Sequence, residues 1–229
     1  MPAARHKLTN ETANHHGARA RLFNAAVREF ATHGLAGTRT DAIAKAAGVN
    51  IALLFYYYSN KQRLYAAVME EVFARWSQAL RPSLDSKASP QQRILAYVDA
   101  FYDFVAASVW RPRLVQQELM RSTHPAAIRK LLKVYVRPIH MKFMKTLREG
   151  IADGSFRDVD VENFYYSTTA IITHYFSNSS ALAAISGTNP VSPARVKTRK
   201  RAVLDLISSA LLNPTADQVK NRLKTWNVK

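Results

Sequence analysis

Cysteine is absent from the sequence, and acidic residues are scarce, with 16 Asp and Glu against 33 Lys and Arg. The absence of cysteine excludes disulfide bonds and thiolate chemistry, and it agrees with a reducing cytoplasm. The shortage of acidic residues leaves a formal net charge of +17. A field of this size attracts polyanions, nucleic acid first and acidic membrane surfaces second.

Targeting segments and catalytic motifs are also missing. The N-terminus has no apolar run that fits a signal peptide, and the longest uncharged stretch carries too many polar groups to span a membrane. The sequence contains no G-x-S-x-G, P-loop, G-x-G-x-x-G or H-E-x-x-H motif, and its seven histidines lack the spacing of metal ligands. We therefore expect a cytoplasmic protein with no metal, no cofactor and no enzymatic activity.

Helical periodicity runs through the chain, and no strand pattern or internal repeat interrupts it. Apolar residues at three- and four-residue spacing predict helices over 18–34, 61–80, 91–108, 110–121, 124–150 and 195–212, and a short amphipathic turn at Val219, Leu223 and Trp226. Pro138 falls inside one of these helices and should kink it. Turn-forming residues from Pro82 to Pro90 predict a break between domains. The expected fold class is all-α.

The stretch from Thr38 to Lys61 organises the rest of the chain. Thr40 is a plausible N-cap for a short helix over 41–47, and Gly48 can adopt the left-handed conformation that closes it. Asn50 can cap a second helix, from Ile51 to Tyr57. Two helices joined by a tight turn with glycine form a helix-turn-helix, a motif that places its second helix in the major groove of DNA.

A set of residues in and around this stretch matches one family in register: Phe30, Gly34, Thr40, Ile43-Ala44, Ala47-Gly48-Val49, Phe55-Tyr56-Tyr57-Tyr58, Asn60-Lys61 and Leu64. On these positions the chain resembles the DNA-binding domain of the TetR family of bacterial transcriptional regulators. The aromatic cluster departs from the family, which usually has Tyr first and Phe last. Residues 51–54 also carry few polar groups that could read bases. Beyond residue 75 only the helical composition is shared.

The resemblance implies which residues meet DNA. Phosphates would be held by Thr40, Tyr57 and Lys61, and base edges would be faced by Ile51, Ala52, Leu53 and Tyr56. Arg39 is added from its position near the start of the first motif helix, as a phosphate or base contact. Apolar side chains in the major groove can contact thymine methyl groups.

Residues 1–17 show no periodicity and mix arginine, lysine and histidine. They predict a disordered basic leader. The alternative is a basic arm that lies along DNA, since such arms reach the minor groove in other helix-turn-helix proteins.

The segment 163–194 contains no charged residue. We expect it to lose water on several faces, partly against its own domain and partly against another subunit, because interfaces of this kind exclude unpaired charge. The resemblance implies a homodimer in which the last two long helices of each subunit form a four-helix interface. We place this interface at 163–185 and 200–211, with the residues Ile172, Tyr175, Phe176, Val203, Leu204, Ile207 and Leu211.

Helix bundles bind small molecules between their helices, behind mostly apolar walls with a few polar groups. Candidate residues for such an effector pocket come from the central helices: Tyr102, Gln117, Glu118, Met120, His140, Phe143, Tyr166, Thr169 and Thr173. Glu118 could balance a cationic ligand or pair with an arginine. Each of the nine could instead be an ordinary core or surface residue.

These features predict a leader at 1–17, a helix-turn-helix DNA-binding domain at 18–64, and a helical regulatory, ligand-binding and dimerisation domain at 65–229. We expect a ligand-responsive transcriptional regulator, a repressor that binds a pseudo-palindromic operator as a dimer and is released by a small-molecule inducer. A non-specific architectural DNA-binding protein or a membrane-surface protein would also explain the charge, but not the uncharged segment. An all-α enzyme is less favoured, because no titratable groups cluster.

Overall fold

The computed structural model describes residues 3–120 and 126–213, with side chains described from residue 17 onward. Within these ranges the regular structure is helical, and an isolated backbone bridge joins Phe156 and Leu212. The all-α expectation is therefore confirmed. The chain forms two compact units: unit 1 comprises Met1–Arg75 and Ser108–Leu132, and unit 2 comprises Trp76–Ala107 and Lys133–Lys229. None of the described helices has the length and apolar character of a membrane span.

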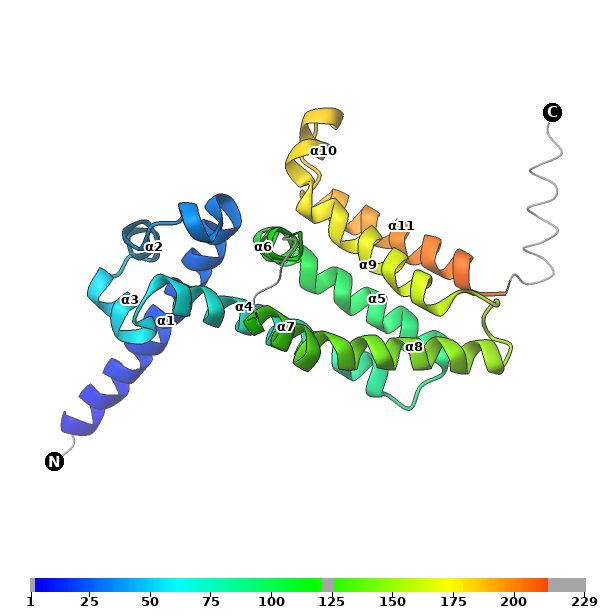
Figure 1. Ribbon diagram of the computed structural model, residues 1–229, viewed down its shortest axis with the longest axis horizontal. Helices are drawn as coiled ribbons and strands as arrows, with labels where there is room; N and C mark the ends of the chain where they lie inside the picture. Colours follow the sequence, from blue (N-terminus) through cyan, green and yellow to red (C-terminus); the bar gives the residue numbers. More distant parts are fainter. Residues whose placement is uncertain (1–2, 121–125, 214–229) are drawn as a thin grey trace. The chain divides into compact units, whose positions relative to one another are not determined.

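Unit 1 contains α1 (Ala3–Gly37), α2 (Thr40–Ala47), α3 (Ile51–Tyr58), the first part of α4 (Lys61–Asp85), α6 (Trp110–Leu119) and α7 (Ala126–Leu131) (Figure 1). Helical geometry in α1 ends at Gly34, which has φ 67° and ψ 177°, as the sequence predicts. At its other end α1 extends back to Ala3, so the predicted disordered leader is a helix from that residue on. Adding turns to a helix that is already anchored requires no new nucleus, so apolar periodicity is not needed there.

The core of unit 1 holds the helix-turn-helix in place. Leu22, Ala26 and Phe30 of α1 are fully buried, together with Ile43 of α2 and Leu54 of α3. Burial of these side chains fixes which face of α3 points inward, and therefore which face remains outside.

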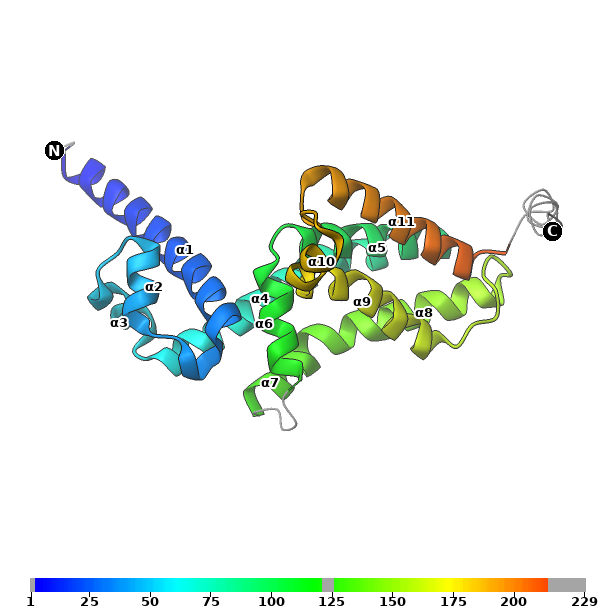
Figure 2. The same cartoon turned by 90° about the horizontal axis from the view of Figure 1, so that it is seen from above.

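Unit 2 is built around α5 (Pro90–Ala106). This helix packs against α8 (Arg137–Ala152), α9 (Val161–Ser177) and α11 (Pro193–Leu211), which lie side by side in Figures 1 and 2. Fully buried residues from all four helices form its core, among them Ile94, Tyr97, Phe143, Ile172 and Ile207. A short helix, α10 (Ser179–Ser186), follows α9 and extends beyond the ends of α9 and α11 (Figure 1).

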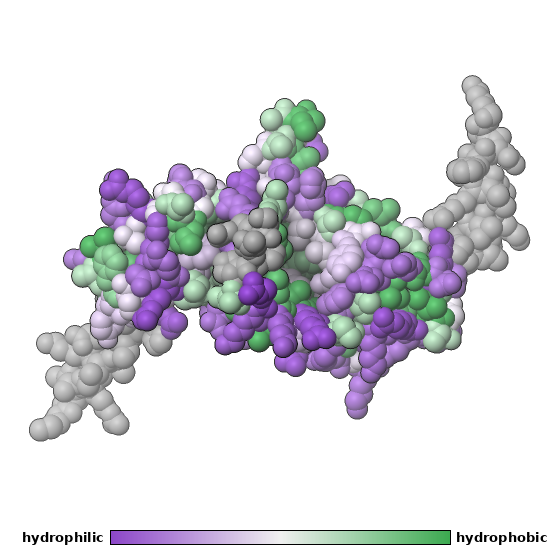
Figure 3. Space-filling view, in the orientation of Figure 1, coloured by the Kyte–Doolittle hydropathy of each residue, from purple (hydrophilic) through white to green (hydrophobic). Residues whose placement is uncertain are grey.

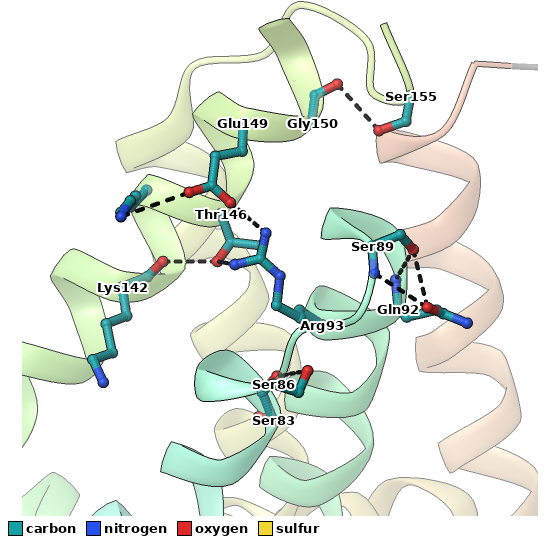
Figure 4. Close-up of polar contacts among 11 residues, drawn as sticks. Ser83, Ser86, Ser89, Gln92, Arg93, Lys142, Thr146, Glu149, Gly150 and Ser155 are labelled. Carbon is teal, nitrogen blue, oxygen red and sulfur yellow. Dashed lines mark hydrogen bonds and ion pairs between the residues drawn. The ribbon is translucent and has the colours of Figure 1, made fainter. Parts of the chain in front are cut away.

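Polar contacts at one end of unit 2 fix α5 against α8 (Figure 4). Ser89 and Gln92 form a reciprocal capping box that starts α5. One turn later the Arg93 guanidinium binds Thr146 and the Glu149 carboxylate, both on α8. Because this ion pair joins two helices and is partly buried, it contributes more than a solvated surface pair.

Two prolines behave differently from one another. The break between domains predicted from Pro82 to Pro90 is wrong, because the two units divide between Arg75 and Trp76, inside α4. Helix α4 continues through Pro82 to Asp85, and only 86–89 separate it from α5. Only three residues of helix follow Pro82, and Ser83 Oγ donates to the Leu80 carbonyl nearby, so little regular bonding is lost. The kink predicted at Pro138 stays a prediction. The helical hydrogen bonding does change just before this residue: a π-helical turn, η1 (Leu132–Val136), leads directly into α8, and Pro138 lies in the first turn of α8.

Unit 1 also includes 108–132, which the sequence assigns to the second domain. The reason is that α6 packs against α1, a long-range contact that periodicity does not reveal. The uncharged segment forms two helices, α9 and α10, which Asn178 separates. His124, Pro125 and the predicted turn at Val219, Leu223 and Trp226 lie outside the described residues.

Candidate DNA-binding surface and effector site

The turn between α2 and α3 has the geometry that its residues predict. Gly48 is left-handed, with φ 63° and ψ 41°, and Asn50 Oδ1 accepts a hydrogen bond of 2.8 Å from the Ala52 N–H. The predicted cap at Thr40 is wrong. Thr40 is the first residue of α2, and Arg39 is the N-cap but forms no side-chain cap bond. Since Thr40 already has helical backbone, its hydroxyl is not placed to cap the following N–H groups.

Helix α3 exposes most of its side chains. Of its eight residues only Leu54 is buried, whereas Ile51, Phe55 and Tyr56 are exposed, with Tyr56 at 77%. Figure 3 shows apolar surface over α3. A cluster of large apolar side chains facing water on a strongly charged protein marks a contact surface.

The residues predicted to bind DNA lie on α2, α3 and the adjacent positions. Arg39, Ile51, Ala52 and Tyr56 are exposed, and Thr40, Leu53 and Tyr57 are half-buried. Arg39 also forms an ion pair of 3.2 Å with Asp41.

Lys45 on α2 and Phe55 on α3 are also exposed, and neither is among the residues predicted to bind DNA. Phe55 lies four residues after Ile51, so helical spacing alone could have placed it on the same face.

Lys61 has an internal role in addition to the predicted one. Its Nζ donates to the carbonyls of Thr38, at 2.9 Å, and Ala36, at 3.2 Å. These bonds tie the start of α4 to the connection between α1 and α2. An ammonium group has three donors, so one N–H remains for the phosphate contact, which stays a prediction.

The nine predicted pocket residues are divided between the two units, and three of them belong to unit 1. Gln117 Nε2 donates to the Ala31 carbonyl at 2.8 Å, and the buried Glu118 carboxylate accepts from the Tyr65 hydroxyl at 2.6 Å. Met120 is 77% exposed. All three lie on or next to α6, whose packing against α1 could not be inferred from its sequence.

Three further candidates in unit 2 have partners of their own. The Tyr102 hydroxyl donates to the Val196 carbonyl at 3.0 Å, Tyr166 bonds Glu162, and Thr173 Oγ1 bonds a backbone carbonyl on its own helix. Burial raises the pKa of Tyr102 to about 12. These bonds occupy the Tyr102 and Thr173 hydroxyls within the fold, and the pocket role of both residues stays a prediction.

The remaining candidates, His140, Phe143 and Thr169, meet two tyrosines in the middle of unit 2. Ring centroids lie 4.8 Å apart for Tyr97 and Phe143, 5.4 Å for Phe143 and Tyr165, and 4.5 Å for His140 and Tyr165. We call this group the hydroxyl cluster: Tyr97 from α5, His140 and Phe143 from α8, and Tyr165, Thr168 and Thr169 from α9. Tyr97 and Tyr165 were missed, although Tyr165 lies one turn before Thr169.

Four polar atoms of the hydroxyl cluster are buried without hydrogen-bond partners among the described residues: Tyr97 Oη, His140 Nε2, Thr168 Oγ1 and Thr169 Oγ1. Burial raises the pKa of Tyr97 well above its usual value, and the nearby Tyr165 hydroxyl adds to the rise. Burial also raises the pKa of Tyr165, which its proximity to the hydroxyls of Thr169 and Tyr97 opposes. Both phenols therefore stay neutral near neutral pH.

Most of the residues predicted at the dimer interface are packed inside their own subunit. Ile172, Phe176, Val203, Ile207 and Leu211 are buried in the core of unit 2, so they are not available to a partner. Tyr175 and Leu204 are half-buried. Apolar periodicity indicates that one face of a helix is buried, but it does not indicate whether the same subunit or a partner subunit buries it.

Metal chemistry has no obvious centre in the part of the chain that the structure describes. Among those residues no group of three or more His, Asp or Glu side chains could hold an ion.

Comparison with known proteins matches two family models to successive parts of the chain. Residues 22–68 match the family model described as "Bacterial regulatory proteins, tetR family", and residues 90–207 match "Tetracyclin repressor-like, C-terminal domain". The chain is 25% identical to the HTH-type transcriptional repressor KstR2 of Rhodococcus jostii over 214 residues, which cover 90% of this chain and 96% of that protein. Over 53 residues it is 53% identical to the repressor SCO4008 of Streptomyces coelicolor, a match that covers 23% of this chain and 28% of that protein.

Solved structures show the same fold. The ketosteroid transcriptional regulator KstR2 of Mycobacterium tuberculosis superposes with a TM-score of 0.72 at 19% identity, over 86% of this chain and 95% of that one. The regulator FadR of Bacillus subtilis, in complex with stearoyl-CoA, gives a TM-score of 0.61 at 19% identity, over 84% of this chain and 98% of that one. From its helix-turn-helix and from the match of both its parts, the chain belongs to the TetR family of bacterial transcriptional regulators.

Proposed function

We propose that the protein is a cytoplasmic, homodimeric repressor without catalytic activity. Two copies of α3 enter successive major grooves of a pseudo-palindromic operator, and a small molecule bound in unit 2 releases the protein from DNA. Phosphate contacts set the position on the duplex, and contacts from α3 to base edges select the sequence.

The exposed face of α3 is the observation that carries this proposal. Non-specific DNA binding needs only cations against phosphates, and it gains nothing from exposing Ile51, Phe55 and Tyr56 to water. In a major groove these side chains can contact thymine methyl groups and the edges of bases. The apolar face therefore favours a sequence-reading protein over a non-specific architectural or membrane-surface protein.

Repression and effector binding rest on the relatives. KstR2 of Rhodococcus jostii and NicS of Pseudomonas putida, to which this chain is 25% identical, both carry the name repressor. FadR, which has a similar fold, is described with stearoyl-CoA bound. A small-molecule effector for this chain is consistent with the buried polar groups of unit 2.

The proposed dimer uses the outward faces of α9 and α11. Ala170 of α9 and Ala202, Leu206 and Ala210 of α11 are exposed and uncharged. On α10, Ile185 is 83% exposed on a helix without charged residues. Two molecules of net charge +17 repel each other, so they can meet only where their surfaces carry no unpaired charge.

Selection of binding sites from a random-sequence DNA pool tests the proposal. Wild-type protein should enrich a two-fold symmetric sequence, and Tyr56→Ala should lose this preference while it still binds DNA weakly. Met120→Ala is the control, because Met120 is equally exposed but follows the last residue of α6. The same enriched sequence for Tyr56→Ala and wild type would show that α3 does not read bases, and no enrichment by wild type would contradict operator binding.

A further inference from the structure

The hydroxyl cluster is unusual because four of its polar atoms are buried and have no hydrogen-bond partner among the described residues. Tyr97 and Thr168 are fully buried, and neither hydroxyl has a hydrogen-bond partner among the described residues. Leaving a buried hydroxyl without a partner is unfavourable, since the group has lost its bonds to water and gained none in return. Such groups call for an explanation at each site.

Three other hydroxyls of unit 2, on the same helices, have hydrogen-bond partners. Tyr102, one helical turn and a half beyond Tyr97 on α5, donates to the Val196 carbonyl. Thr146 and Thr173 each donate to a carbonyl one turn earlier in their own helix. The unpartnered hydroxyls therefore gather at one place, where α5, α8 and α9 meet, and do not reflect a general shortage of partners.

The cluster also has a definite chemical character. No Lys, Arg, Asp or Glu belongs to it. An ionic group of a ligand buried there would therefore have no ammonium, guanidinium or carboxylate group of the cluster to pair with. The rings of Tyr97, Phe143 and Tyr165 supply flat apolar surface. The Tyr97 and Thr169 hydroxyls can each donate to a carbonyl oxygen or accept from a hydroxyl, and the His140 ring nitrogen adds another polar contact.

We propose that the hydroxyl cluster holds the polar end of the effector, and that the effector is a neutral ring compound with a hydroxyl or keto group. This inference rests on the proposed function, because it names the class of molecule to which unit 2 responds. Tyr97 and Thr169 are the residues that select the neutral polar group, and Phe143 and Tyr165 contact the ring.

A matched series of small probes tests the ligand class on the full-length protein by isothermal titration calorimetry. The probes 2-naphthol, 2-tetralone and 2-naphthoate share a fused two-ring skeleton and differ in their polar group. Wild-type protein should bind 2-naphthol or 2-tetralone at least about ten-fold more tightly than 2-naphthoate, since the carboxylate must be buried without a counter-charge. Tighter binding of 2-naphthoate, or no binding of either neutral probe, would overturn the proposed class.

Removing a single oxygen atom tests the residue. Tyr97→Phe should keep or raise the thermal unfolding temperature of the ligand-free protein, because it deletes an unpartnered buried hydroxyl, and it should weaken binding of the neutral probe about ten-fold. Tyr102→Phe is the matched control on the same helix. It should lower the unfolding temperature, because it removes a made hydrogen bond, and leave the affinity for the probe unchanged.

The proposal is overturned if Tyr97→Phe lowers the unfolding temperature as much as Tyr102→Phe does and leaves the affinity for the probe at the wild-type value. The Tyr97 hydroxyl would then be structural, for example bonded to a buried water. Gel shifts of both variants without probe separate this inference from the proposed function. Unaltered operator binding with failed probe binding rejects the ligand class alone, whereas absent operator binding by wild type rejects the proposed function.

Discussion

Gly150 is the residue at which the fold leaves no room for a side chain. A Cβ atom built there would lie 2.2 Å from Cδ2 of Phe156, whose buried ring packs where α8 ends. Gly150→Ala should therefore lower the free energy of unfolding by about 1–3 kcal/mol, measured by urea denaturation. Gly17→Ala is the control, because its Cβ would meet only the end of the Arg21 side chain at 3.6 Å. Equal stability of the two variants would contradict the close packing of α8 on Phe156.

Arg39 offers the simplest test of a phosphate contact, since it is exposed and bonded only to an exposed partner, Asp41. Arg39→Ala should weaken binding to all DNA sequences alike, and it should reduce the slope of log Kobs against log salt by about one per subunit. Arg81→Ala is the control, because Arg81 is also exposed and ion-paired but lies in unit 2. An unchanged slope for Arg39→Ala would remove Arg39 from the interface.

Among the elements, those fixed by local signals were predictable and those fixed by tertiary contacts were not. The turn at Gly48 and Asn50 is specified by the residues within it, so α2 and α3 follow from the sequence within one residue. The packing of α6 on α1 depends on residues far apart in the sequence. Tertiary packing also decides to which unit each predicted pocket residue belongs, so the sequence could not show that these residues are divided between two units. Tyr97 could not be selected from the sequence either, because its neighbours Phe143 and Tyr165 lie on other helices.

The cap of α3 gives a prediction at this scale. Asn50→Ala removes the acceptor for the Ala52 N–H and should destabilise the protein by about 1 kcal/mol. Because α3 carries the proposed base contacts, operator affinity should fall as well. Asn50→Ser is the control, since serine caps helices comparably and should restore both quantities in chemical denaturation and gel shift. If Asn50→Ala and Asn50→Ser lower the free energy of unfolding equally, the cap bond does not stabilise α3.

At the scale of the whole molecule, the uncharged segment indicates an interface but not which face of each helix forms it. Ile172 and Ile207 are buried within the subunit, so a charge at either position would unfold unit 2 and would not simply separate subunits. The outward face of α11 is the better position for a test, because its residues tolerate a charge in the isolated subunit.

Leu206→Glu should therefore yield folded monomers, since a two-fold interface brings the same carboxylate together from both subunits. Leu206 is 52% exposed on α11, and Met141, which is 51% exposed on α8, provides the control Met141→Glu. Sedimentation equilibrium should give a dimer for wild type and Met141→Glu and a monomer for Leu206→Glu. A dimer for all three would move the interface away from α11.

Hydroxyl-radical footprinting on a fragment that the wild-type protein selects tests the central claim, that a dimer reads DNA through two copies of α3. The predicted result is two protected patches on two-fold related half-sites, spaced by about one helical turn of 10–10.5 base pairs or a multiple of it. Tyr56→Ala should lose the pair of patches at the same protein concentration. A single patch, or uniform protection without a preferred position, would contradict the account.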